Sequence, residues 1–487
     1  MKNSLFSKII DKICGFIGRQ GAFIACAMLL LSLPCLVPVH DGVTFTLPRF
    51  TSALAQSLCI ATALAILIDL ISKKWFGWTL TGILAFLFTF NVGVAISQEM
   101  HFDSRTLRLI LQSNPSESAE FLDTYLFKWH TLGMLVTTAL ILMLYAFLPV
   151  KRWIGAMSQR AKAVTAAIFT LCEALSLAVF LTMSIFTTEQ YAYTTLQQDI
   201  YAFSRQESHT ETIARLRCSN DAAKVDSVTN LSPKIVLVIG ESHTRLHSQI
   251  YGYGHPTMPR MTQALNDSQI VVMDSVRSRH AVTFEVIPEM YSLHNPYDPS
   301  DWRDYPLVQA IFRKAGYQVD LFDNQGSRSH LPETVDFDVN YFLNDDTIER
   351  QCFSYRNDTI FRYDGDMLDH ALEKCSPAVP GPRLTILHLT GQHLRAEKRY
   401  PKEFAKFTPA DYDASKYTEK QRNDIAHYDN ATLYLDSVLA RIFEAYSGEE
   451  AVVLYMPDHG EEIHDFRNFY GRKAEYPTGK AAECLLH

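Results

Sequence analysis

Residues 233–242, PKIVLVIGES, set five consecutive apolar residues ahead of a glycine, a glutamate and a serine. A continuous apolar run of this kind is typical of a strand that is buried on both faces, as in a parallel sheet. Glu241 and Ser242 would then lie at the carboxyl end of the strand. Ligands of open α/β sheets bind beyond the carboxyl ends of the strands, so these two polar residues mark a candidate site.

Further short apolar runs follow this one and alternate with helical patterns. The helix-like stretches are residues 305–315, 365–374 and 417–446. Such an alternation predicts an α/β domain whose largely parallel sheet is covered by helices on both faces. The runs expected to form the other strands are QIVVM, YQVDLFDNQ, LTILHLTGQH and AVVLYMPDHGEE.

Five apolar runs before residue 188 are long enough to cross the ~30 Å hydrocarbon core of a membrane. Lys and Arg gather before the first run, between the second and third, and between the fourth and fifth, so these segments are expected in the cytoplasm. An odd number of spans then places everything after about residue 187 on the outer side. The predicted spans are residues 21–39, 51–71, 75–97, 129–148 and 163–186.

Three regions follow from this pattern: a five-helix transmembrane domain over 1–187, an amphipathic connector over 188–232 and an outer α/β domain over 233–487. The net charge of −8, with no basic cluster in the outer domain, argues against nucleic acid as a partner. Cysteines of the outer domain would face an oxidising compartment, so one disulfide is expected. The sequence leaves its connectivity open, and Cys352 with Cys375 is the first pairing to consider.

Polar side chains that can bind a metal follow several of the predicted strands. Glu241 follows the first strand, His393 follows LHLTGQ in the fourth, and Asp458 with His459 follows the fifth. Carboxylates and imidazoles gathered at one edge of a sheet are unfavourable unless they meet a cation. Zinc accepts such oxygen and nitrogen ligands at ~2.0 to 2.2 Å. Glu241, Asp458 and His459 therefore predict a zinc site with one coordination position left open.

Five motifs stand out along the outer domain: VLVIGES, SRHAVTFEVIPEM, FDNQG, LHLTGQH and YMPDHGEE. Together they resemble those of the membrane phosphoethanolamine transferases of the alkaline phosphatase and sulfatase superfamily. The stretch SRHAVTFEVI is similar to the pattern of members that modify lipopolysaccharide core sugars. The resemblance covers nearly the whole chain and implies an α-helical transmembrane domain followed by an α/β/α alkaline-phosphatase-like (sulfatase-like) domain. It also implies an inner-membrane protein with a cytoplasmic amino terminus and a periplasmic catalytic domain.

The resemblance implies a role for each residue that matches the family's site. Glu241 matches the first zinc ligand, and Asp458 with His459 matches the pair that completes the site. Thr283 matches the nucleophile, which also contacts the metal. Coordination lowers the pKa of the hydroxyl, so that a threonine can attack phosphorus at neutral pH. His393 matches a histidine that stabilises charge on the phosphoryl group or protonates a leaving oxygen. Ser242 is then expected to cap the helical turn that follows it.

The resemblance also implies the substrates. The donor is phosphatidylethanolamine, the acceptor is a lipopolysaccharide core sugar or lipid A, and the head group passes through a covalent phospho-threonine. In the outer loop LQSNPSESAEFLDTYL, Glu117 matches an acidic position that would attract the ethanolamine ammonium, and Asn114 is a second candidate, although solvation alone would explain both. A phosphoglycerol or other head-group transferase would use the same metal and threonine. A non-catalytic membrane protein that keeps the domain as a binding module is the alternative from another class.

Two features depart from the family, and a third argues against a related activity. His464 is a poor positional match for a further histidine, so a second metal stays open. The family continues with another buried strand where this chain reads AECLLH, so we expect an incomplete domain whose outer sheet edge is unpaired. Cysteine flanked by Pro and Arg, the precursor of formylglycine in sulfatases, does not occur in the outer domain, which argues against sulfate ester hydrolysis.

Overall fold

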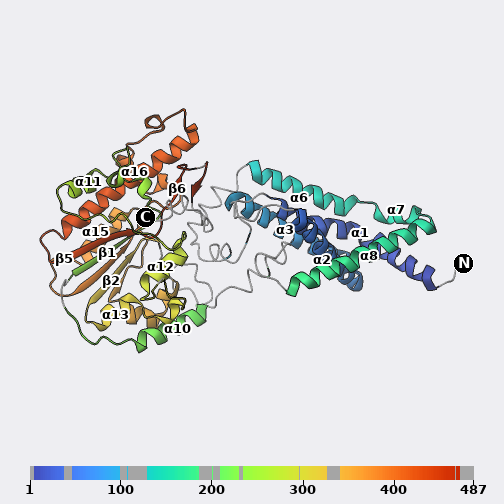
Figure 1. The fold of residues 1–487 in the computed structure, drawn as a ribbon, viewed down its shortest axis with the longest axis horizontal. Coiled ribbons are helices and arrows are strands. Elements are labelled where there is room, and N and C mark those ends of the chain that lie inside the picture. The colour runs from blue at the N-terminus through green and yellow to red at the C-terminus, as the bar shows by residue number, and fades with distance from the viewer. Residues whose placement is uncertain are drawn as a thin grey trace. The chain divides into compact units, whose positions relative to one another are not determined.

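The computed structural model consists of two compact units (Figure 1). The described residues up to 200 belong to the first unit, and those from 209 onward belong to the second. The boundaries at residues 187 and 232 stay predictions. The structure describes residues 5–37, 47–98, 102, 107, 129–185, 200, 209–229, 234–295, 297–325, 341–466 and 468–471.

The first unit is built from long apolar helices. Four of the described helices are long and apolar enough to cross a membrane, and α6 with α7, which meet at a bend of 41°, would make a fifth span. The predicted helical membrane domain is confirmed at this level, although its first helix begins at Leu5, well before the predicted residue 21. The helices are α1 (Leu5–Ser32), α2 (Leu47–Ile71), α3 (Lys74–Gln98), α6 (Trp129–Phe147), α7 (Val150–Ala156) and α8 (Gln159–Ile185).

Buried side chains from several of these helices form one core. Phe23 on α1 and Phe88 on α3 pack together with Ala61 and Ala65 on α2, all at most 3% exposed. Small residues such as these alanines let neighbouring helices approach closely, which is the usual basis of helix association in membranes. Each helix therefore keeps one face for its neighbours and presents aliphatic side chains outward, as Leu171 does on α8.

The second unit contains a five-stranded sheet in the order β3-β2-β4-β1-β5, with every pair parallel. Gly240 at the end of β1 lies opposite Pro457 at the end of β5, so the two strands end side by side. The predicted parallel α/β sheet is confirmed. The strands are β1 (Lys234–Gly240), β2 (Gln318–Asp323), β3 (Tyr355–Arg356), β4 (Arg383–His388) and β5 (Ala451–Pro457), and a separate antiparallel pair joins β6 (Glu462–Ile463) to β7 (Tyr470–Gly471).

Two hydrophobic cores lie on the two faces of the sheet, because the side chains of β1 alternate between them. Val236 and Val238 point into one core, whereas Ile239 points into the other. The first core is covered by α11 (Pro259–Asn266), α15 (Asp364–Lys374) and α16 (Glu419–Ala445), and the second by α10 (His209–Ala222), α12 (Thr283–Tyr291), α13 (Val308–Lys314) and α14 (Asp346–Cys352) (Figure 1).

The predicted disulfide between Cys352 and Cys375 is wrong, since both are free cysteines. Cys352 packs in the core with α13 and α14, and Cys375 packs in the core with α15 and α16. A disulfide needs Cα atoms within ~7 Å of each other, and the sheet separates these two. Burial, followed by the charge of Asp320, raises the pKa of the Cys375 thiol to about 12.

One predicted strand does not form. The run QIVVM, residues 269–273, belongs to no strand, and its Val271 is 89% exposed. Among the described residues β5 pairs with β1 alone, and its Val452 and Leu454 are 48% and 37% exposed. The edge of the sheet beside β5 is therefore open within the described part of the chain.

Candidate active site

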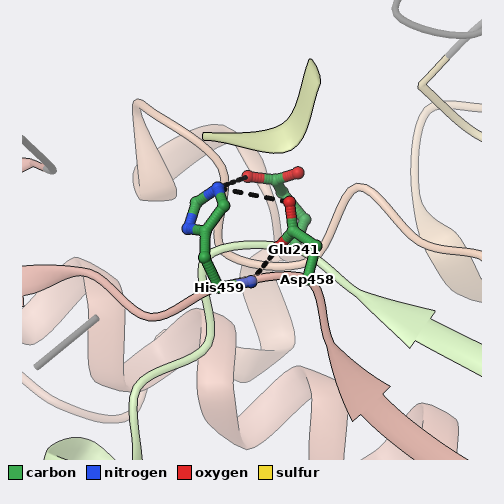
Figure 2. A group of neighbouring side chains, drawn as sticks. All are labelled: Glu241, Asp458 and His459. Carbon is green, nitrogen blue, oxygen red and sulfur yellow. Dashed lines mark hydrogen bonds and ion pairs between the residues drawn. The ribbon is translucent and has the colours of Figure 1, made fainter. Parts of the chain in front are cut away.

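Three buried side chains gather where β1 and β5 end. Glu241 directly follows β1, and Asp458 and His459 directly follow β5, so the parallel register of these strands brings them together. None is more than 1% exposed. One ligand atom from each lies within 4.8 Å of the others. Figure 2 shows the imidazole turned toward both carboxylates.

Hydrogen bonding fixes the tautomer of His459. Its Nδ1 lies 2.8 Å from the carbonyl oxygen of Gly460. A carbonyl only accepts, so Nδ1 donates, and in the neutral ring Nε2 keeps its lone pair. That Nε2 lies 3.4 Å from Oε1 of Glu241 and 3.2 Å from Oδ2 of Asp458. A backbone carbonyl that orients a histidine in this way is typical of metal ligation.

Thr283 brings a hydroxyl to the same place. It is the first residue of α12, it follows Val282 in extended conformation, and it is 6% exposed. Its Oγ1 donates to Oε2 of Glu241 at 3.1 Å and lies 3.3 Å from Nε2 of His459. The amino end of a helix carries a partial positive charge, which favours an anionic group there. The hydroxyl is therefore held between the three ligand atoms and a helix end suited to a phosphoryl group.

Two carboxylates and an imidazole in a buried site fit a divalent cation. Buried carboxylates are strongly unfavourable unless charges or hydrogen bonds compensate them. The donor set of two oxygens and one nitrogen is one that zinc accepts, and Thr283 Oγ1 lies within 3.3 Å of two of these groups. The residues present thus fit one zinc ion.

Ser242 acts differently from the predicted cap. It has a left-handed backbone with φ +56°, and its Oγ donates to Oε1 of Glu241 at 2.7 Å. Its backbone N–H donates to Oδ1 of Asp458 at 3.1 Å. The capping residue of the next turn is Thr244, whose side chain accepts from the N–H of Leu246. The prediction failed because a capping residue is normally extended, as Thr244 is, whereas Ser242 has a left-handed backbone.

The motif FDNQG places two further groups, Asp323 and Gln325, at this edge of the sheet. Asp323 lies 3.1 Å from Nδ1 of the fully buried His388. Burial acts to lower the pKa of His388, but Asp323, together with the charges of Glu241 and Asp458, raises it to about 9. Gln325, two residues beyond β2, donates from Nε2 to Oε2 of Glu241 at 3.0 Å.

His393 lies on the loop that follows β4, and this loop packs against the backbone of Glu241. The N–H of Gln392 donates to the carbonyl oxygen of Glu241 at 3.0 Å. The side chain of His393 is half-buried, and its role at the phosphoryl group stays a prediction. Asn114 and Glu117 lie outside the described residues. His464 is buried and bonds through Nε2 to Asp424 at 3.1 Å.

Comparisons with known proteins agree with this fold. The family model described as Sulfatase matches residues 233–483. Phosphoethanolamine transferase EptC of Escherichia coli (strain K12) is 27% identical over 265 residues, which are 52% of this chain and 44% of that protein. The chain thus spans less than half the length of that relative. The putative transferase YhbX of Escherichia coli O157:H7 is 23% identical over 94% of this chain and 75% of its own.

A solved structure supports the two-unit architecture. It is the integral membrane lipooligosaccharide phosphoethanolamine transferase A (EptA) from Neisseria meningitidis, with a TM-score of 0.60 and 17% identity over 96% of this chain and 87% of that one. The predicted resemblance to the membrane phosphoethanolamine transferases is confirmed, and the apolar helices make the protein an integral membrane protein. Because the family model covers more than half of the 487 residues, the chain belongs to the Sulfatase family.

Proposed function

We propose that this protein is a zinc-dependent transferase that moves phosphoethanolamine from phosphatidylethanolamine to lipopolysaccharide, at a core sugar or at lipid A. The observation that carries the proposal is the position of Thr283, whose buried Oγ1 lies 3.1 Å from Glu241 Oε2 and 3.3 Å from His459 Nε2. Relatives named phosphoethanolamine transferases support the class of group that is moved. Acceptors are suggested by relatives named Kdo(2)-lipid A phosphoethanolamine 7''-transferase.

The first step makes a bond from Thr283 to phosphorus. Zinc, when bound, lowers the pKa of a coordinated hydroxyl and offsets negative charge on the phosphoryl oxygens. Glu241 Oε2 accepts the hydrogen bond of Thr283 Oγ1, so it aims the oxygen and can take its proton. Oγ1 attacks phosphorus in line while the bond to the glycerol oxygen breaks, and diacylglycerol leaves with a proton that His393 can supply.

The second step returns Thr283 to its free state. An oxygen of the acceptor attacks the phosphorus of phospho-Thr283 and loses its proton to His393, while the Oγ1–P bond breaks and Glu241 returns the proton to Oγ1. The amino end of α12 stabilises the charge that develops on phosphorus in both steps. Glu117 would bind the ethanolamine ammonium, with Asn114 beside it. Donor and acceptor would both be membrane lipids, which gives the apolar helices a purpose. The proposal assigns the catalytic unit to the periplasmic side of the inner membrane.

The mass of the purified full chain tests this function. After incubation with zinc and phosphatidylethanolamine, the wild-type chain should carry an adduct of ~120 Da, because a covalent intermediate accumulates when no acceptor is present. Thr283→Ala should carry none, whereas Thr359→Ala, which removes a surface hydroxyl, should carry it. An adduct that persists in Thr283→Ala, or a wild-type chain that never acquires one, would overturn the proposal. A heavier adduct of the mass of phosphoglycerol would identify the other head-group transfer instead.

A further inference from the structure

Gln325 reaches the metal ligand Glu241 from the far side of the central strands. Its own strand, β2, is separated from β1 by β4. From there the side-chain Nε2 donates to Glu241 Oε2 at 3.0 Å and to the carbonyl oxygen of Leu389, just beyond β4, at 2.8 Å. One amide group therefore crosses the ends of three neighbouring strands.

The carbonyl of Leu389 decides which way this amide points. A backbone carbonyl only accepts, so the NH₂ group, not the oxygen, of Gln325 must face it. The other hydrogen of the same NH₂ is then directed at Glu241. The anchor is itself held, because the N–H of Leu389 donates to the carbonyl of Ile239 at 2.8 Å. Asp364 holds the residues that follow Leu389, because its carboxylate accepts from the N–H of Gly391 at 2.9 Å.

The two oxygens of Glu241 are held by different groups. Oε1 accepts from Ser242 Oγ at 2.7 Å. Oε2 accepts from both Gln325 Nε2 at 3.0 Å and Thr283 Oγ1 at 3.1 Å. A carboxylate held at both oxygens cannot rotate about its last bond, so the oxygen that faces the nucleophile is fixed before substrate arrives.

We propose that Gln325 is a positioning residue, which holds the carboxylate of Glu241 so that Oε2 faces Thr283 and the carboxylate is aligned for the metal. This inference rests on the proposed function for its effect on turnover, but its effect on metal binding stands apart from the reaction. Groups that orient a metal ligand typically change metal affinity or activity by about 10- to 100-fold when they are removed.

Zinc affinity of the full chain in detergent, measured by competition with a chromophoric chelator, tests the inference. Gln325→Met keeps the length of the side chain and removes its donor. Gln325→Asn keeps an amide that is too short to reach both acceptors. Each should raise the Kd for zinc by about 10- to 100-fold. Gln351→Met is the matched control, because Gln351 Nε2 donates to Asp221 at 2.8 Å, outside the site, and this variant should bind zinc as the wild type does.

Turnover gives the second readout. In both Gln325 variants kcat should fall while KM for phosphatidylethanolamine stays within about twofold, because the residue aligns the nucleophile rather than the lipid. Thermal unfolding of the metal-free chains confirms that each variant is folded. Wild-type zinc affinity in both folded variants would overturn the inference, even if the chain proves to be a transferase. If the Gln325 variants lose zinc affinity and the wild-type chain transfers nothing, the proposed function is refuted and the positioning role stands.

Discussion

Replacing Gly391 by alanine tests whether the loop after β4 holds Glu241 in place. Gly391 has φ +51°, and a Cβ there would lie 2.7 Å from the carbonyl oxygen and 2.8 Å from the amide nitrogen of Glu241. Backbone atoms cannot turn aside as a flexible side chain can. The left-handed conformation is unfavourable by ~1 to 2 kcal/mol for a residue with a Cβ. The steric overlap adds ~1 to 3 kcal/mol, as in other overpacked interiors.

Gly391→Ala should therefore lower the free energy of unfolding by about 2 to 5 kcal/mol and move Glu241 away from the other ligands. Gly316→Ala is the matched control, since Gly316 has φ +88° but a Cβ there would meet nothing within 4 Å. In the control, the free energy of unfolding should fall only by the conformational contribution, about 1 to 2 kcal/mol. Urea unfolding gives these values, and chelator competition should show a zinc affinity lowered ~10-fold or more in Gly391→Ala alone.

Two results would refute this reasoning. Equal losses of stability in Gly391→Ala and Gly316→Ala would mean that the loop yields without strain at its contact with Glu241. Wild-type zinc affinity in Gly391→Ala would mean that the backbone of Glu241 does not set the position of its carboxylate.

Further predictions concern the buried ion pair beside the site and the metal itself. Asp429→Asn should lower the free energy of unfolding by ~3 to 5 kcal/mol, because Oδ1 of Asp429 lies 2.7 Å from Nδ1 of buried His247; a loss below ~1 kcal/mol in urea unfolding would contradict this. Burial acts to lower the pKa of His247, but Asp429 and Asp465 raise it to about 10, so the folded chain holds a proton that the unfolded chain releases above ~6.5. The stabilisation by this pair should be complete below pH ~6.5 and be lost as the pH rises toward about 10. Over this pH range the urea midpoint should fall more in the wild type than in Asp429→Asn. Chelation should lower the thermal unfolding midpoint of the wild type and zinc should restore it, whereas a chain carrying His459→Ala should respond to neither.

The sequence was sufficient to predict the parallel sheet and the grouping of three polar side chains at its edge, because both depend on local pattern. The apolar run 235–239 predicted β1, and strand ends in a parallel sheet fall at one edge, so Glu241, Asp458 and His459 could be expected together. Thr283 came from the resemblance, since a threonine at the start of a helix has no signal of its own.

The predictions that were wrong, and the one residue that was missed, depend on contacts between distant segments. Apolar content predicted a strand at 269–273, but a strand needs a neighbour to pair with, and composition does not say whether one is there. Cys352 with Cys375 was the first pairing to consider, but the sequence does not show that α14 and α15 cover opposite faces of the sheet. Gln325 gave no signal because its role requires β2, β4 and β1 to be neighbours in that order.

The arrangement of the candidate ligands would couple a bound metal to the sheet edge. Glu241 follows β1 and Asp458 with His459 follows β5, so a bound cation would tie a central strand to one that has, among the described residues, a single strand partner. Thr283 would tie α12 to the same point. Because the unfolded chain does not hold these groups together, the free energy of metal binding adds to the stability of the folded state. Chelation should therefore loosen β5 before the rest of the sheet, and amide exchange should increase first at residues 451–457.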